Sequence, residues 1–67
     1  MDEIDIWRTA NLALQRHGEA GPEFASRRIS ELTLAGDAAG ADVWSRILAA
    51  MAVLRMRQGP DDPGQLH

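Results

Sequence analysis

The sequence predicts an all-α fold in which three helices form a small bundle over residues 1–58 and residues 59–67 form a disordered tail. Three observations predict this fold. Apolar residues recur every three or four positions, as they do on helices that lie against a core. Glycine and proline separate these segments, where helices begin and end. The final stretch, QGPDDPGQLH, combines glycine and proline with little that a core could bury.

The first helix is expected over residues 5–17. Asp2 or Asp5 can cap its start, where acidic side chains suit the positive end of the helix dipole, and Gly18 can end it. Leu12 lies off the apolar face and is a candidate contact for a partner. At about 100° per residue, one face collects the following side chains: Ile6, Trp7, Ala10, Ala13, Leu14 and His17.

His17 is interpreted as a structural residue. In the last turn of a helix, an imidazole can hydrogen-bond to the terminal carbonyls and complement the dipole. A metal-binding or catalytic role would need a second ligand or an acid–base partner. The other histidine, His67, lies in the predicted tail.

The second helix is expected over residues 22–35, because Pro22 suits the first helical position and Gly36 suits the position just past the end. Arg28 falls among the inward-facing residues and is a candidate polar anchor. Its guanidinium can extend along the edge of the core or pair with a carboxylate such as that of Glu31. The inward-facing apolar residues are Phe24, Ala25, Ile29, Leu32 and Ala35.

The third helix is expected over residues 38–58, with Asp37 as its N-cap. Because Gly36 stops one helix immediately before Asp37 starts the next, the two helices should form a hairpin or a helix-turn-helix corner. Gly40 lies in the first turn, which suggests that a backbone segment or a side chain approaches it closely. The alternative is that the helix starts at Ala41.

The third helix has two apolar sides. The side away from the core carries Ala49, Ala52, Val53 and Met56, and we expect these residues, with Leu12, to form an interface. The core-facing side carries Val43, Trp44, Ile47, Leu48, Met51 and Leu54.

Arg46 is the second candidate polar anchor. It can stack on an aromatic ring such as that of Trp7, pair with a carboxylate across a dimer, or remain solvated. Trp7 and Trp44 are expected to be the largest elements of the core. The predicted core comprises Trp7, Leu14, Ile29, Leu32, Trp44, Ile47, Leu48 and Met51.

The residue types argue against an enzyme. No acid–base pair, activated nucleophile or metal cluster occurs at usable spacing, and Asp61 and Asp62 lie in the predicted tail. We therefore expect no catalytic residue, cofactor, metal or small-molecule substrate. The acidic start of the chain and its longest apolar run, residues 47–54, predict neither a signal peptide nor a membrane span. A cytoplasmic protein is expected.

Several short motifs are spread along residues 4–54: Ile-Trp at 6–7, His-Gly at 17–18, Gly-Asp at 36–37 and Val-Trp-x-Arg-Ile at 43–47. With these motifs the chain resembles a group of short uncharacterised proteins of alphaproteobacteria. The stretch at residues 20–22 departs from their pattern and puts the start of the second helix in doubt. The resemblance implies a small cytoplasmic helical protein and carries no assigned activity or site. The other matching residues are Ala10, Ala25, Arg28, Leu32, Gly40, Ala50 and Leu54.

The expected function is a protein–protein interaction module that forms a homodimer or docks on a larger protein through the third helix. A 67-residue chain without cysteine buries only about 60% of its unfolded surface and cannot add disulfides, so association would stabilise it.

The alternative is a helix-turn-helix protein that binds nucleic acid. A short glycine-containing turn precedes the third helix, which carries Arg46, Arg55 and Arg57. Against it, the net charge is −3, and the first turns of that helix hold small residues and Asp42 where a recognition helix has basic ones.

Overall fold

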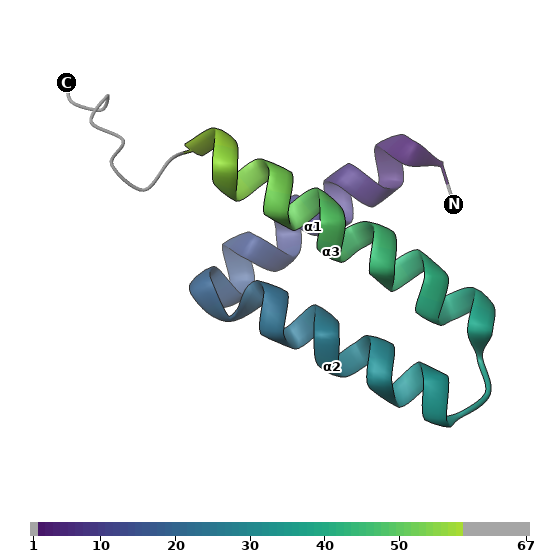
Figure 1. The fold of residues 1–67 in the computed structure, drawn as a ribbon. Helices are drawn as coiled ribbons and strands as arrows, with labels where there is room; N and C mark the ends of the chain where they lie inside the picture. Colours follow the sequence, from purple (N-terminus) through teal and green to yellow (C-terminus); the bar gives the residue numbers. More distant parts are fainter. Residues whose placement is uncertain (1, 59–67) are drawn as a thin grey trace, which may run out of the picture.

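The computed structural model describes residues 2–58, and nearly all of them are helical (Figure 1). The elements are α1 (Glu3–His17), the short 3-10 helix η1 (Gly18–Ala20), α2 (Gly21–Leu34) and α3 (Ala38–Gln58). No strand occurs within this range, so the all-α prediction is confirmed. The predicted tail, residues 59–67, lies outside the described residues.

Helix α1 begins two residues earlier than the sequence predicted. Asp2 is its N-cap, in an extended conformation, and the Asp2 carbonyl accepts a hydrogen bond from the backbone N–H of Ile6 at 3.1 Å. The carboxylate of Asp2 makes no capping hydrogen bond. Glu3 and Asp5 therefore both lie in the first turn, where their charges complement the helix dipole.

The connection between α1 and α2 is tighter than expected. Gly18 adopts a φ of 58°, and the chain then continues through η1 directly into α2, which starts at Gly21 rather than Pro22. Gly21 is buried against Leu14, where a Cβ would lie 3.0 Å from the Leu14 Cδ2. A side chain here would require the Leu14 side chain to move by a few tenths of an ångström, because α1 and α2 meet at this point.

Helices α2 and α3 form an antiparallel hairpin (Figure 1). The last turn of α2 closes with two hydrogen bonds, from the Gly36 N–H to the Thr33 carbonyl at 3.1 Å and from the Asp37 N–H to the Leu32 carbonyl at 2.8 Å. This is the Schellman arrangement, which needs the positive φ that Gly36 adopts. Of the two arrangements that the sequence allowed, the chain adopts the hairpin.

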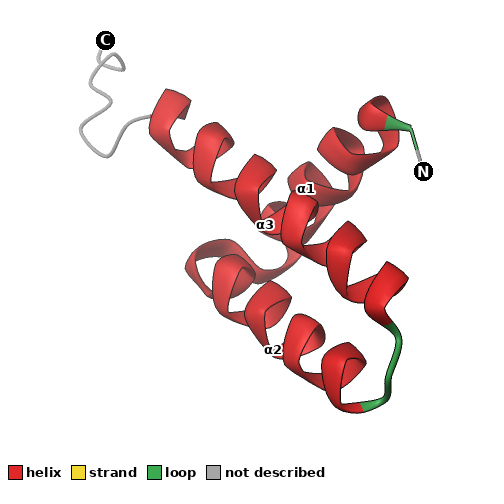
Figure 2. Cartoon of the chain, turned by 45° about the vertical axis from the view of Figure 1, so that its right-hand side comes forward, coloured by secondary structure: helices red, strands yellow, loops and turns green. Residues whose placement is uncertain are grey.

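Helix α3 holds the fold together. It packs along α2 and also crosses α1, whereas α1 and α2 make fewer contacts with each other. Figure 2 shows the crossing of α1 and α3 from a second direction. One side of α3 therefore faces both other helices, and the opposite side faces away from them.

The core is small and rich in alanine. Ile47 and Met51 are its largest fully buried side chains. Small residues let helix backbones approach closely, which explains how three helices meet with few large side chains between them. The buried apolar residues are Ile6, Ala10, Ala13, Ala25, Ile47, Ala50 and Met51.

The two tryptophans are not the centre of this core, which corrects the sequence-based expectation. Trp7 and Trp44 are half-buried and pack against its edge. Close contacts through alanine leave too little space between the helices for an indole, so both rings lie at the rim. The other half-buried members of the predicted core are Leu14, Ile29, Leu32 and Leu48.

Candidate interaction surface on the third helix

The side of α3 opposite its buried face carries a row of apolar residues. We call Ala49, Ala52, Val53 and Met56 the outer stripe. All four are exposed: Val53 retains 41% and Met56 78% of its maximal surface. At about 100° per residue, the stripe lies opposite the buried Ile47. These four residues lie on the side that the sequence assigned away from the core, and their role as an interface stays a prediction.

A groove lies directly beside the outer stripe. It has a volume of about 360 Å³ and runs between the first half of α1 and the middle of α3. Buried Ile6 and Ala50 and half-buried Trp7 form apolar parts of its wall. The stripe and the groove share Ala49 and Val53, so they form one continuous surface.

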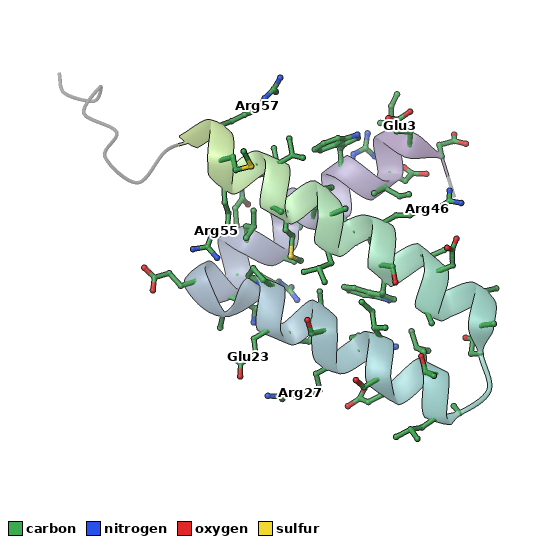
Figure 3. All side chains as sticks on the ribbon, viewed as in Figure 1. Glu3, Glu23, Arg27, Arg46, Arg55 and Arg57 are labelled. Carbon is green, nitrogen blue, oxygen red and sulfur yellow. The ribbon has the colours of Figure 1, made fainter. Side chains whose placement is uncertain are left out.

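Charged residues border this groove. Glu3 comes from the first turn of α1 and Arg46 from α3, and Figure 3 shows both on the side where these helices cross. Sequence reasoning missed Glu3, although it lies one helical turn from Trp7 and so shares its face of α1. The groove is thus apolar along its wall and charged at its border.

Arg46 is held within its own helix. Its Nε lies 3.1 Å from the Asp42 Oδ2, and both side chains are mostly exposed. Of the three alternatives, the structure thus shows a solvated arginine paired one turn away. Arg46 and Trp7 line the same groove. A pair across a dimer remains a prediction.

Arg28 makes the contact that its spacing indicated. Its Nη1 donates a hydrogen bond to the Glu31 Oε1 at 3.1 Å. The two side chains retain 43% and 54% of their surface, so the ion pair lies on the outside of α2. Exposed pairs of this kind contribute about 0.2–1 kcal/mol, which makes Arg28 a local surface feature.

Leu12 lies on a different surface from the outer stripe. It is exposed on α1 and lines a second hollow, of about 400 Å³, together with Arg16 of α1. This hollow shares no lining residue with the groove beside the stripe. The predicted interface therefore divides into two parts, and only the α3 residues form one continuous surface.

Aromatic rings from the three helices meet at this second hollow. The ring of His17 stacks on Phe24 with centroids 4.4 Å apart, and Phe24 contacts Trp44 edge to face at 5.7 Å. His17 is exposed, and this stack gives it a packing role. The cluster could not be foreseen from periodicity, because it joins residues of different helices.

Among residues 2–58, no group of three or more histidine, aspartate or glutamate side chains could hold a metal ion. None of the helices described is both long and apolar enough to cross a bilayer.

The labelled basic side chains are spread over different parts of the molecule. Figure 3 shows Arg27 projecting from α2 and Arg57 near the end of α3, on opposite edges of the molecule. The first turn of α3 exposes Ala38 and Ala39, and Asp42 follows. This distribution differs from that of a recognition helix, whose first turns present polar side chains to the bases.

Comparison with known proteins gives one informative match. A model described as a family of unknown function (DUF6961) matches residues 2–59 and so covers every helix. No curated protein and no solved structure matches the chain.

Proposed function

Because the chain belongs to the DUF6961 family of unknown function, we propose from its geometry that it is a non-enzymatic protein–protein interaction module. It docks through the outer stripe and the adjoining groove, on a second copy of itself or on a larger protein. We further propose that it acts in the bacterial cytoplasm, in keeping with the resemblance described above.

The observation that carries this proposal is the exposure of Val53 and Met56 beside a groove with an apolar wall. Single exposed apolar residues are ordinary, whereas a continuous apolar surface with a charged border is typical of a binding site. Here Val53 and half-buried Trp7 line the same groove. A partner would cover the indole and the stripe together.

The composition of the core supports the same proposal. Four of the seven buried apolar residues are alanines, which contribute little apolar area each. Larger side chains such as Trp7, Leu48 and Leu54 remain half-buried at its edge. Association would remove more of this surface from water and so would stabilise the fold.

Replacing Val53 with glutamate tests the proposal. A carboxylate in an apolar contact is costly to desolvate, so Val53→Glu should weaken binding. Leu34→Glu is the matched control: Leu34 is 89% exposed at the end of α2, away from the groove. Both variants should keep the circular dichroism spectrum and the melting temperature of the wild type.

Two measurements read out the result. Sedimentation velocity over a concentration series reports self-association, and quantitative affinity capture from the native host reports other partners. The proposal predicts that Val53→Glu reduces one of these signals while Leu34→Glu leaves both unchanged. A wild type that stays monomeric and retains the same proteins as Val53→Glu would overturn it.

A further inference from the structure

We infer that the partner at the outer stripe is a second copy of the chain, with the two α3 helices antiparallel about a two-fold axis near Ala49. This inference rests on the proposed function and names its partner. It follows from the order of charged, small and apolar residues along the exposed side of α3.

The exposed side of α3 carries an acidic residue near its start and a basic residue near its end, and Arg46, which pairs with Asp42, lies between them. Asp42 lies near the start and Arg57 near the end, both exposed, and Ala49 lies about halfway between them. At about 100° per residue, both charged residues fall within about 80° of Ala49, so all three share one side of the helix. An antiparallel neighbour would bring Asp42 of each copy beside Arg57 of the other.

A parallel arrangement of the two α3 helices does not pair Asp42 with Arg57. A parallel pair would place Asp42 beside Asp42 and Arg57 beside Arg57, and like charges in contact repel. A two-fold axis also repeats each favourable contact, because residue i meets j and j meets i. The order of Asp42 and Arg57 on α3 is thus complementary to itself when one copy is reversed.

Asp42 remains able to take part in such a pair. Its contact with Arg46 is an exposed pair one turn apart, with side chains 61% and 64% exposed, and pairs of this kind contribute about 0.3–0.5 kcal/mol. A carboxylate has two oxygens and can accept from a second guanidinium. The intrahelical pair therefore orients the Asp42 carboxylate and leaves it able to accept a second hydrogen bond.

The middle of the stripe fits close contact between two helices. Ala49 and Ala52 have short side chains, so the axes of two α3 helices can approach to about 8–10 Å. In the antiparallel register, Val53 of one copy lies opposite Ser45 of the other, at about equal distances from the axis. Small residues at the centre with larger ones beside them give complementary surfaces.

Charge reversal tests the pairing. We expect Asp42→Arg and Arg57→Asp each to weaken self-association at least tenfold in sedimentation equilibrium at low salt. The double variant Asp42→Arg/Arg57→Asp should recover most of this loss, because the opposite charges meet again. Glu31→Arg on α2 is the control and should leave self-association unchanged. Thermal melts of each variant separate lost association from lost folding.

Engineered cysteines test the direction of the helices, since the chain has none of its own. In the antiparallel register, Ser45→Cys of one copy meets Val53→Cys of the other. Each cysteine lies about 12 Å along the axis from its own symmetry mate, beyond the reach of a disulfide. Mixing the two variants under mild oxidation should therefore give crosslinked dimers, and neither variant alone should.

The outcomes separate the two proposals. A wild type that stays monomeric while Val53→Glu loses a different bound protein overturns the dimer and keeps the interaction module. Crosslinking of each cysteine variant with itself, or a double charge variant that fails to recover association, overturns the antiparallel arrangement. A Val53→Glu variant that behaves like the wild type in every binding assay overturns both.

Discussion

The carboxylate of Asp37 accepts a hydrogen bond from the backbone N–H of Gly40 at 2.9 Å, and this contact starts α3. The same carboxylate occupies the space that a side chain at position 40 would need. A Cβ on Gly40 would lie 2.5 Å from the Asp37 Oδ2 and 2.9 Å from its Cγ. The close approach that the glycine indicated in the sequence is thus made by the helix cap itself.

Replacing Gly40 with alanine should therefore not stabilise the protein, although alanine is favoured over glycine by up to about 1 kcal/mol inside helices. The added methyl displaces the Asp37 carboxylate and removes its hydrogen bond, which costs about 0.5–2 kcal/mol. We expect Gly40→Ala to be neutral or destabilising in thermal and urea unfolding.

The matched experiment repeats Gly40→Ala in a protein that lacks the Asp37 carboxylate. In an Asp37→Ala background the methyl meets no carboxylate, so Gly40→Ala should raise the free energy of unfolding. A double-mutant cycle measures the difference directly. Equal effects of Gly40→Ala in both backgrounds would show that the two residues are not coupled.

The ion pair between Arg28 and Glu31 should contribute little to stability. Its two side chains are about half exposed, and such pairs typically contribute 0.2–0.5 kcal/mol at three- or four-residue spacing, roughly the error of one measurement. We expect Glu31→Gln to shift the urea midpoint only slightly, and less still in high salt, where the charges are screened. A loss of more than about 1 kcal/mol would assign the pair a larger structural role.

The sequence predicted the helices well because local signals determine them. Gly36 and Asp37 mark the junction of α2 and α3, and the structure shows a helix stop and a cap at these residues. The predicted start of α1 was two residues too late. Asp2 and Asp5 are both plausible caps in the sequence, and in the structure Asp2 is the N-cap without a side-chain hydrogen bond. Boundaries of this kind depend on small differences in energy.

The packing was harder to predict because it depends on how closely the helices approach. Periodicity shows which side of a helix faces inward, but it does not give the distance to the next helix. Alanines at positions 10, 25 and 50 bring the helices together and leave Trp7 and Trp44 at the edge. The groove beside α3 follows from the crossing with α1, which no local pattern encodes.

Enlarging a core alanine should destabilise the protein. Ala25 is fully buried on α2, and extra methyl groups there would push the packed helices apart. Overpacking of this kind typically costs 1–3 kcal/mol. We expect Ala25→Leu to lower the melting temperature strongly and Ala39→Leu, at an exposed position in the first turn of α3, to change it little. Equal effects at both positions would contradict the alanine-mediated packing.

Binding to nucleic acid, the alternative function, remains a prediction, and a duplex-binding experiment decides it. The chain carries a net charge of −3, and Arg27 and Arg57 lie on opposite edges of the molecule. Nonspecific binding to DNA requires several phosphates to be neutralised together, so we expect no binding even at low salt. Fluorescence anisotropy with a labelled random duplex measures it, and a basic DNA-binding domain serves as the positive control.

A contrary result would have a defined signature. If the duplex bound, the logarithm of the affinity would fall linearly with the logarithm of the salt concentration, by nearly one unit of slope for each phosphate contacted. Arg57→Gln would then lower that slope by about one if Arg57 contacts the backbone. Arg27→Gln, on the opposite edge, would leave the slope unchanged, so the pair of variants would locate the edge of the molecule that faces the DNA.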